Sequence, residues 1–162
     1  NTLASTLQDL PVDSSVQFWD GSAFQAVSRV PDFLGSWSGL AGGATDVSPG
    51  KAFFVSIPSG TVTNTWVGEV LTGDLTNSMT AGFNFVGNQA PIAGGADAIG
   101  LGAAMAVDDS VQKWDGSGFV SYSKVPDFLG TWSPSEPIIN VAEGFFVSLA
   151  SASDWTQTVT VD

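Results

Sequence analysis

The only side chains with evident catalytic potential in this chain are its carboxylates. The 162 residues include no histidine and no cysteine, which excludes the commonest general base, the Ser-His-Asp triad, the thiol nucleophile and the usual zinc ligands. A hydrolase would therefore need two carboxylates, one acting as an acid and one as a base or nucleophile. The candidates for such a pair are Asp20, Asp32, Glu69, Asp115 and Asp127.

The four aspartates in this set have simpler structural roles. Asp20 and Asp115 each begin an Asp-Gly-Ser sequence, which is typical of a tight turn closed by the aspartate itself. Asp32 and Asp127 each follow a proline, where the carboxylate can close the next turn. Because these aspartates occur as repeated pairs, a catalytic role would also require two identical active sites. We therefore predict no catalytic residue, and a protein that is not an enzyme.

Three further aspartates, Asp97, Asp108 and Asp109, are the best candidates for a metal site. Calcium takes carboxylate oxygens, but the sequence has no DxDxDG loop, so solvated side chains are the simpler expectation. The glycine-rich runs GLAGGATDVSPG and IAGGADAIGLG lack the lysine of a phosphate-binding loop. We therefore expect no metal and no cofactor.

Two tryptophans offer a different chemistry, the binding of sugars. Trp19 and Trp114 directly precede Asp20 and Asp115, so an exposed indole would lie beside a carboxylate that accepts hydrogen bonds from sugar hydroxyls. In the simpler interpretation, the six tryptophans fill the core of a small β-protein. A carbohydrate-binding or adhesive module, with surface glycans as its partners, is the alternative that these four residues leave open.

Composition and charge narrow the function classes further. Sixteen Asp and Glu against four Lys and Arg give a formal net charge of −12, which disfavours nucleic acids and anionic membranes as partners. No apolar stretch reaches the roughly 18 residues of a membrane-spanning helix, so membrane insertion is not expected. The few charges and many glycines are typical of a secreted or surface β-protein. We expect an extracellular or cell-surface location after removal of an export signal, because Asn1 does not open a signal peptide.

Two stretches of the chain repeat each other. Residues 16–37 (VQFWDGSAFQAVSRVPDFLGSW) and 111–132 (VQKWDGSGFVSYSKVPDFLGTW) align at an offset of 95 residues, with 15 of 22 positions identical. Further along, KAFFVSI at 51–57 aligns with EGFFVSL at 143–149 at an offset of 92. The sequence therefore predicts an internal duplication, with one copy after the other in the chain.

The repeated stretches predict mainly β structure. Each Trp-Asp-Gly-Ser sequence indicates a β-hairpin, over residues 16–27 and 111–122. The apolar runs 51–57 and 143–149 are typical of central strands that are covered on both faces.

A loop with the sequence VPDFLG follows each hairpin. Its proline argues against a central strand, because proline lacks the N–H that a ladder needs. The first copy of the loop carries Phe33 and Leu34 and leads to Trp37. We expect these three apolar side chains to tuck under one edge of the sheet.

The remaining segments alternate between short helical and extended patterns. We expect helical turns at residues 2–10 and 96–106, strands at 62–70, 82–87 and 155–161, and a connection between the copies at 71–79. Residues 155–161 alternate apolar or amide side chains with threonine, which is typical of a strand with one face in water.

The predicted fold class is all-β. It consists of two pseudo-symmetric antiparallel β units, sandwich-like or barrel-like, with one short helical turn in each. The expected units are residues 1–75 and 76–162. The second unit opens with the strand GFNFVG at 82–87, whereas the first begins directly at its helical segment, so its leading strand is expected to be missing. The alternatives are that this strand lies upstream of Asn1 in a longer precursor, or that the sheet does not need it.

Several motifs together resemble a known but functionally uncharacterised module. The sequences GFNFVGNQAP, VPDFLG, EGFFV and WVGEV resemble the GFNL, VPDG, GEGFFV and VGEV pattern of a tandem β-module in secreted or surface proteins of Verrucomicrobia and related bacteria. The resemblance covers essentially the whole chain and implies export, not a chemical activity. The chain departs from the module at its start and at Lys51, where the module has a glutamate like Glu143.

These observations together predict a structural protein of the cell exterior. A unit that lacks one strand exposes a sheet edge, and a neighbouring copy can supply the missing strand. Such a head-to-tail contact does not close on itself and builds a fibre. We therefore expect the repeating subunit of a pilus-like surface filament, with copies of itself as partners.

Overall fold

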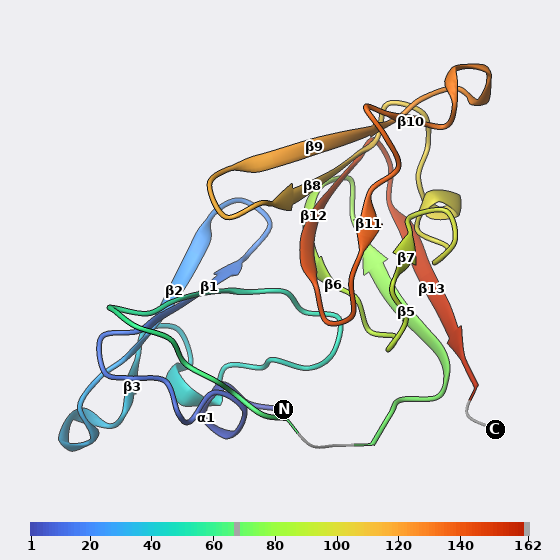
Figure 1. Cartoon of the computed structure of the whole chain (residues 1–162). Helices are drawn as coiled ribbons and strands as arrows, with labels where there is room; N and C mark the ends of the chain where they lie inside the picture. The colour runs from blue at the N-terminus through green and yellow to red at the C-terminus, as the bar shows by residue number, and fades with distance from the viewer. Residues whose placement is uncertain (67–68, 161–162) are drawn as a thin grey trace. The chain divides into compact units, whose positions relative to one another are not determined.

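The structure is a computed structural model that describes residues 1–66 and 69–160, and it is mostly β with antiparallel sheets (Figure 1). The chain divides into two compact units, Asn1–Glu69 and Val70–Asp162. They are called unit 1 and unit 2 below, and each is described by itself. The boundary lies six residues before the position expected from the sequence, 75 against 69.

Unit 1 is built on one four-stranded antiparallel sheet with the strand order β3-β2-β1-β4. Its elements, in chain order, are α1 (Leu3–Thr6), β1 (Ser15–Trp19), β2 (Phe24–Arg29), the 3-10 turn η1 (Asp32–Leu34), β3 (Trp37–Ser38), η2 (Gly42–Ala44) and β4 (Phe54–Ser56). The hairpin β1–β2 confirms the prediction made from Trp-Asp-Gly-Ser.

The helix α1 is a single turn, Leu3–Thr6, within residues 2–10, where one or two helical turns were expected. Thr2 caps its first turn by accepting a hydrogen bond from the backbone N–H of Ser5. With no regular helix beyond Thr6, Leu7 and Leu10 still reach the core, where they pack with Leu3. The apolar spacing therefore marks the buried residues of this segment correctly.

Unit 2 contains a five-stranded antiparallel sheet, β10-β9-β8-β12-β6, and two two-stranded ribbons, β13-β5 and β11-β7. Its elements are β5 (Gly73–Met79), β6 (Gly82–Gly87), β7 (Gly94–Gly95), η3 (Gly102–Ala104), β8 (Ser110–Trp114), β9 (Phe119–Lys124), η4 (Asp127–Leu129), β10 (Trp132–Ser133), β11 (Ile138–Ile139), β12 (Gly144–Leu149) and β13 (Ser153–Val159). The predicted hairpin β8–β9 and the predicted strands β6, β12 and β13 are confirmed.

The core of unit 2 joins the five-stranded sheet to the ribbon β13-β5. Val111 and Val147 from the sheet belong to the same buried cluster as Met79 and Trp155 from the ribbon. The ring centroids of Phe145 and Trp155 lie 5.8 Å apart. Along β13 every second residue is buried, as the alternation with threonine predicted. Two β layers therefore enclose one apolar core in this unit.

Three predicted segments differ from the structure in their secondary structure, and the strand predicted as central at 51–57 is β4, at the margin of its sheet. Residues 71–79, expected to be a connection, contain strand β5, which pairs with β13 over its whole length. Residues 96–106 contain only the short turn η3, because two glycines in this segment, Gly100 and Gly102, favour turns over a continuous helix. The strand expected at 62–70 is absent over the described residues 62–66, and residues 67–68 lie outside the described part of the chain.

The prediction that the loop VPDFLG tucks its apolar residues under the sheet is wrong for two of the three. Phe33 is 85% exposed and Leu34 is also exposed, whereas Trp37 is half-buried. The loop closes on itself, because Arg29 donates hydrogen bonds to Asp32 and to the carbonyl of Ser36 across its neck. The 3-10 turn then projects outward, and only the tryptophan after it returns to the sheet.

Candidate functional site: the outer edge of strand β4

The two units differ most at a pair of strands with nearly the same sequence. Strand β12 of unit 2 lies between β8 and β6 (Figure 1). Its aligned counterpart β4 in unit 1 pairs with β1 on one side, and within residues 1–66 and 69–160 no strand pairs with its other side. We call this second side the outer edge of β4.

Matched residues of these two strands differ in burial. The sequence FFVS is common to residues 53–56 and 145–148. Val147 is fully buried in unit 2, whereas Val55 in unit 1 is 43% exposed. Phe145 is buried and Phe53 is half-buried. Since the side chains are identical, the difference comes from what covers them.

Strand β6 is one of the elements that cover β12. It runs antiparallel along all six residues of β12, with Val86 opposite Phe145 and Asn84 opposite Val147. The rings of Phe85 and Phe146 stack at 4.4 Å. A partner strand of this kind removes the backbone of β12 from water and completes the sheet.

Strand β6 is the last strand of its sheet, and side chains form hydrogen bonds with backbone carbonyls at its ends. The side-chain amide of Asn77 donates to the carbonyl of Gly87, at one end of the strand. At the other end, the side-chain amide of Asn84 donates to the carbonyls of Thr80 and Gly82. These side chains occupy backbone acceptors that would otherwise invite another strand. Unit 2 therefore has side-chain hydrogen bonds at both ends of β6.

The aspartates considered for catalysis have turn roles. Oδ1 of Asp20 accepts hydrogen bonds from the backbone N–H groups of Ser22 and Ala23, and Oδ2 accepts one from Gln25. In the same way Asp115 accepts from residues 117 and 118. The backbone hydrogen bonds, above all the one from Ala23, hold the pKa of Asp20 far below its usual value. Hydrogen bonds led by the one from the backbone of Ser117 also lower the pKa of Asp115.

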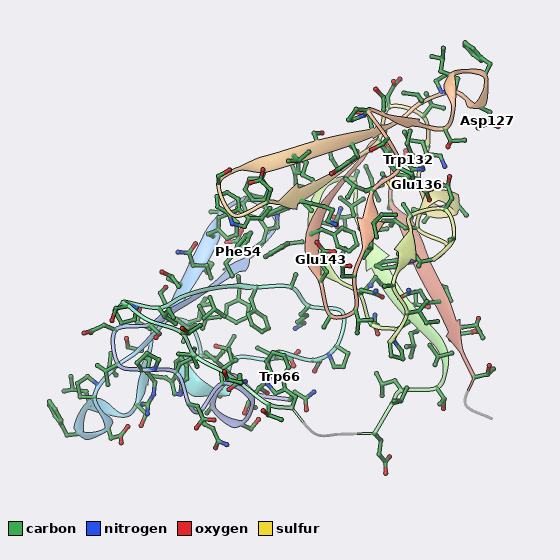
Figure 2. The ribbon with its side chains drawn as sticks, viewed as in Figure 1. Phe54, Trp66, Asp127, Trp132, Glu136 and Glu143 are labelled. Atoms are coloured by element: carbon green, nitrogen blue, oxygen red, sulfur yellow. The ribbon has the colours of Figure 1, made fainter. Side chains whose placement is uncertain are left out.

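The other three carboxylates lie at separate places on the surface. Asp32 accepts a hydrogen bond from the hydroxyl of Ser36 and pairs with Arg29 at 3.0 Å, and these contacts, led by the one from Ser36, lower its pKa. Asp127 lies on the projecting loop that follows β9 (Figure 2). Glu69 is exposed. Across the described residues, no hydrogen bond joins two of the five candidates.

The three metal candidates are also engaged in different interactions. Asp97 pairs with Lys124 at 3.1 Å, and Asp108 lies in a turn with a φ of 73°. Asp109 is buried and accepts hydrogen bonds from the backbone N–H groups of Ala106 and Ala150. In the part of the chain that the structure describes, no three acidic side chains gather as they would around a cation.

The two tryptophans considered for sugar binding pack against neighbouring aromatic rings. The centroids of Trp19 and Phe24 lie 5.2 Å apart, as do those of Trp114 and Phe119, and both pairs are edge-to-face. Trp19 is half-buried and Trp114 is exposed over about half of its surface. Because Asp20 uses both oxygens within its own turn, a sugar would have to compete for that carboxylate.

Sequence reasoning missed the acidic residues that hold unit 2 together over long distances in the chain. Glu143 forms an ion pair with Lys113 at 3.0 Å, and Glu136 accepts a hydrogen bond from the backbone of Asp97; Glu136 and Glu143 are labelled in Figure 2. The signal in the sequence that could have pointed to these contacts was the small number of basic residues, since each is surrounded by an excess of possible acidic partners. All four are in ion pairs: Arg29–Asp32, Lys51–Asp46, Lys113–Glu143 and Lys124–Asp97.

Comparisons of the chain with protein-family models, with curated proteins and with solved structures find no match. In the described residues, no helix combines the length and the apolar character that crossing a bilayer demands. The outer edge of β4 is therefore identified as a candidate site by comparing the two units of this molecule.

Proposed function

We propose that the protein is an extracellular structural subunit, and that its copies assemble into a pilus-like fibre by adding a strand of one copy to the outer edge of β4 in the next. The observation that carries this proposal is the contrast between β4 and β12. The same FFVS sequence has two partner strands in unit 2 and one among the described residues of unit 1.

The proposal includes an origin of the two units by duplication. Beyond the sequence repeat, the hairpins β1–β2 and β8–β9 have the same register, with Val16 opposite Val27 and Val111 opposite Tyr122. Each is followed by a 3-10 turn that ends in a glycine with positive φ, Gly35 or Gly130. A common ancestral unit explains why β4 has the sequence of a central strand at the margin of its sheet.

Adding a strand supplies both backbone hydrogen bonds and apolar contacts at this edge. A new strand satisfies backbone donors and acceptors along β4. Covering Val55 as completely as Val147 contributes part of the roughly 1.5–3 kcal/mol that full burial of such a side chain is worth. Because the donor and the acceptor are different surfaces, the contact is heterologous and continues from copy to copy.

An extracellular or cell-surface location agrees with the rest of the chain. The protein is acidic and uses no cysteine, and its charge disfavours nucleic acid. The resemblance to the tandem module of secreted bacterial proteins supports the same location. Copies of this chain are the partners that the proposal requires, and no cofactor takes part.

A substitution at the exposed valine tests the proposal directly. Lysine at a sheet edge opposes strand pairing, so Val55→Lys should abolish fibres in electron micrographs of material in which the unaltered chain forms them. Val107→Lys is the matched control, because Val107 is 46% exposed and lies outside the strands. Fibres of unchanged yield from Val55→Lys, or dispersed particles from the unaltered chain at every concentration, would refute the proposal.

The carbohydrate-binding alternative has weaker support. The indoles of Trp19 and Trp114 already contact Phe24 and Phe119, which leaves less ring surface for stacking on a sugar. Titration with surface glycans, followed by tryptophan fluorescence, tests this alternative. A saturable change that Trp114→Ala removes would favour it over the fibre.

A further inference from the structure

The loop VPDFLG has the same strained conformation in both units. Its Asp-Phe-Leu residues form a 3-10 turn, η1 in unit 1 and η4 in unit 2. The glycine that follows has a φ of 96° at Gly35 and 97° at Gly130. The next residue also has a positive φ, 67° at Ser36 and 62° at Thr131, although it carries a Cβ. Backbone strain of this kind is found most often at sites that bind a partner.

The side chains that this turn presents are apolar and exposed. Phe33 is 85% exposed in unit 1 and Phe128 is 84% exposed in unit 2, and the leucine that follows each is exposed as well. Among the described residues, no other large apolar side chain is as exposed as these two phenylalanines. The turns therefore hold an apolar pair in water that the fold of either unit does not use.

The turn of unit 2 also carries an unpaired carboxylate. Lys124 and Thr131, which precede and follow the turn, both donate to Asp97. The side chain of Asp127, labelled in Figure 2, forms no hydrogen bond or ion pair with any residue in the part of the chain that the structure describes. The aligned aspartate of unit 1 is bound within its own loop, as described above. Residues 127–129, called the unit 2 tip, thus combine a free carboxylate with two exposed apolar side chains.

Unit 1 has an open hollow of about 400 Å³ at the base of its own loop. Its walls include Arg29, Trp37 and Gly43, together with Ala4 and Gln8 from the start of the chain. This volume lies within the range of pockets that bind small ligands. Because a cation and an aromatic ring lie next to small residues, the hollow suits an apolar side chain that has a carboxylate beside it.

The cation and the ring of this hollow both have unused binding capacity. The guanidinium of Arg29 lies over the ring of Trp37, 5.6 Å from its centroid. All three hydrogen bonds of Arg29 come from Nη1, and its buried Nε has no partner among the described residues, although a guanidinium has five N–H donors. Trp37 is half-buried, whereas the aligned Trp132 is buried. The hollow can therefore donate to a carboxylate and bury more of its indole.

We infer that the unit 2 tip of one copy docks in the hollow of unit 1 in another copy. The carboxylate of Asp127 accepts hydrogen bonds from Arg29, and Phe128 packs against Trp37. Charge identifies a second copy as the occupant, because the chain has only four basic residues and one of them lines the hollow, while the matching free carboxylate is on the tip.

This contact goes beyond the proposed function and does not depend on strand addition at β4. The donor surface belongs to unit 2 and the acceptor surface to unit 1, so the contact is heterologous and can continue from copy to copy. A single tip covers much less area than a stable interface needs. The contact is therefore weak by itself and is best detected by covalent trapping.

Photo-cross-linking of the full chain tests the inference. The probe p-benzoylphenylalanine is placed at position 128, and probe-bearing chains are mixed with ¹⁵N-labelled chains. Mass spectrometry then recognises cross-links between copies by their mixed isotope content. We expect mixed cross-links to peptides that contain residues 4–8 or 29–43. The same probe at position 33 is the matched control, since its turn and exposure are alike but its aspartate is bound. It should give about tenfold fewer mixed cross-links to the hollow, because it lacks the ion pair.

Two substitutions test the chemistry of the contact. Ala4→Glu in the labelled chain places a like charge in the hollow, and Asp127→Asn in the probe chain removes the charge of the tip. Each should lower the yield of mixed cross-links by about tenfold. Ala4→Gln is the control for size and should leave the yield unchanged. Ala4 is exposed, so its variants should keep the fold, which circular dichroism checks.

The outcomes separate this contact from the proposed function. Equal mixed yields from positions 33 and 128, or a yield that Ala4→Glu does not lower, would overturn the inference. Cross-links to the hollow that never mix isotopes would show that the tip docks within its own copy, and a contact between copies would be wrong. Fibres without any mixed cross-link would refute the tip contact and leave strand addition standing. Val55→Lys should leave the cross-link unchanged, and its loss there would refute the independence of the two contacts.

Discussion

Asp109, which the sequence suggested as a candidate metal ligand, instead links two distant segments of unit 2 through hydrogen bonds. Its two oxygens accept hydrogen bonds from the backbone of Ala106 and of Ala150, both at 2.7 Å. The second bond joins residues that are 41 positions apart. In unit 1 the aligned residue is Ser14, which is also buried. The carboxylate therefore connects the segment before β8 with the residue that follows β12.

We expect Asp109→Ala to lower the free energy of unfolding of unit 2 by about 2–3 kcal/mol. The substitution removes the two hydrogen bonds that the backbone N–H groups of Ala106 and Ala150 donate to the buried carboxylate, and bonds to a charged group are among the stronger ones. Urea denaturation followed by circular dichroism measures the change. Asp154→Ala, at an exposed position on β13, is the control. Equal losses for the two variants would contradict the role of Asp109.

Asp97 makes the stability of unit 2 depend on pH. Burial by itself raises the pKa of Asp97, but the nearby side chain of Trp132 and the hydrogen bond and charge of Lys124 outweigh it, and the pKa is lowered. A carboxyl whose pKa is lower in the folded state stabilises the fold above its unfolded pKa of about 3.9. This contribution is lost as the pH falls through the folded pKa.

Asp97→Asn should therefore destabilise the protein near neutral pH and make little difference in acid. The loss near pH 7 should be under about 1 kcal/mol, because the carboxylate is partly exposed and the pair is screened by solvent. Urea titrations from pH 7 down to about 2.5 measure the difference between the two proteins, and that range brackets the unfolded pKa. A difference that grows toward acid would have the wrong sign for this mechanism.

At the residue scale, the sequence predicts local contacts well and distant ones poorly. Asp20 and Asp115 bond to residues two or three positions away, so their turn role is visible in the motif itself. Asp109 and Glu143 act on partners in other elements. Nothing in the neighbouring sequence names such partners, because the chain fold brings them together.

At the scale of elements, the hairpin turns allow a matched test of backbone conformation. Gly116 has a φ of 102°, whereas Gly118 in the same turn has no positive φ, and a Cβ at either position meets nothing within 4 Å. The cost of a side chain there is purely conformational. In unit 1 the position of Gly118 is occupied by Ala23, so alanine is already accepted at that position in the other hairpin.

We expect Gly116→Ala to destabilise the protein by about 1 kcal/mol or more, because positive φ is costly for a residue with a Cβ. Gly118→Ala should be neutral or slightly stabilising, because it restricts the unfolded chain without straining the folded one. Thermal unfolding of the two variants side by side measures both effects. A larger loss for Gly118→Ala would show that sterics outside the turn decide the outcome.

The strand that sequence analysis missed shows why elements differ in predictability. Residues 73–79, GDLTNSM, contain few strongly β-forming side chains. Their pairing partner β13 lies about 80 residues further on, and Thr76 and Thr156 share a hydrogen bond at 2.8 Å across the ribbon. The hairpins β1–β2 and β8–β9 were predictable because their turn signal lies between their strands.

At the scale of the whole molecule, the repeat predicts two alike units, yet it does not predict how each sheet ends. The FFVS sequence suggested a central strand in both copies, and the structure confirms this only for β12. A strand takes its central or marginal place from its neighbours, which lie elsewhere in the chain. Among the described residues, β4 has a partner strand on one side and β12 has partners on both sides.

An incompletely covered unit should also be the less stable one when the chain is dispersed. Unit 2 closes its core with the ribbon β13-β5, and the described part of unit 1 has no equivalent ribbon. We therefore expect the amides of Val16 and Val27 to exchange faster than those of the aligned Val111 and Tyr122. Each 1.4 kcal/mol between the local opening free energies corresponds to about a tenfold difference in exchange rate.

Assembly should remove this difference, because binding to the folded state raises the stability of the unit that binds. In fibres the exchange of Val16 should slow toward that of Val111, while Val111 itself should change little. Hydrogen exchange of dispersed and assembled material, quenched and read by mass spectrometry, measures both units in one sample. If Val16 and Val111 already exchange equally in the dispersed chain, unit 1 needs no partner and the argument from its open edge fails.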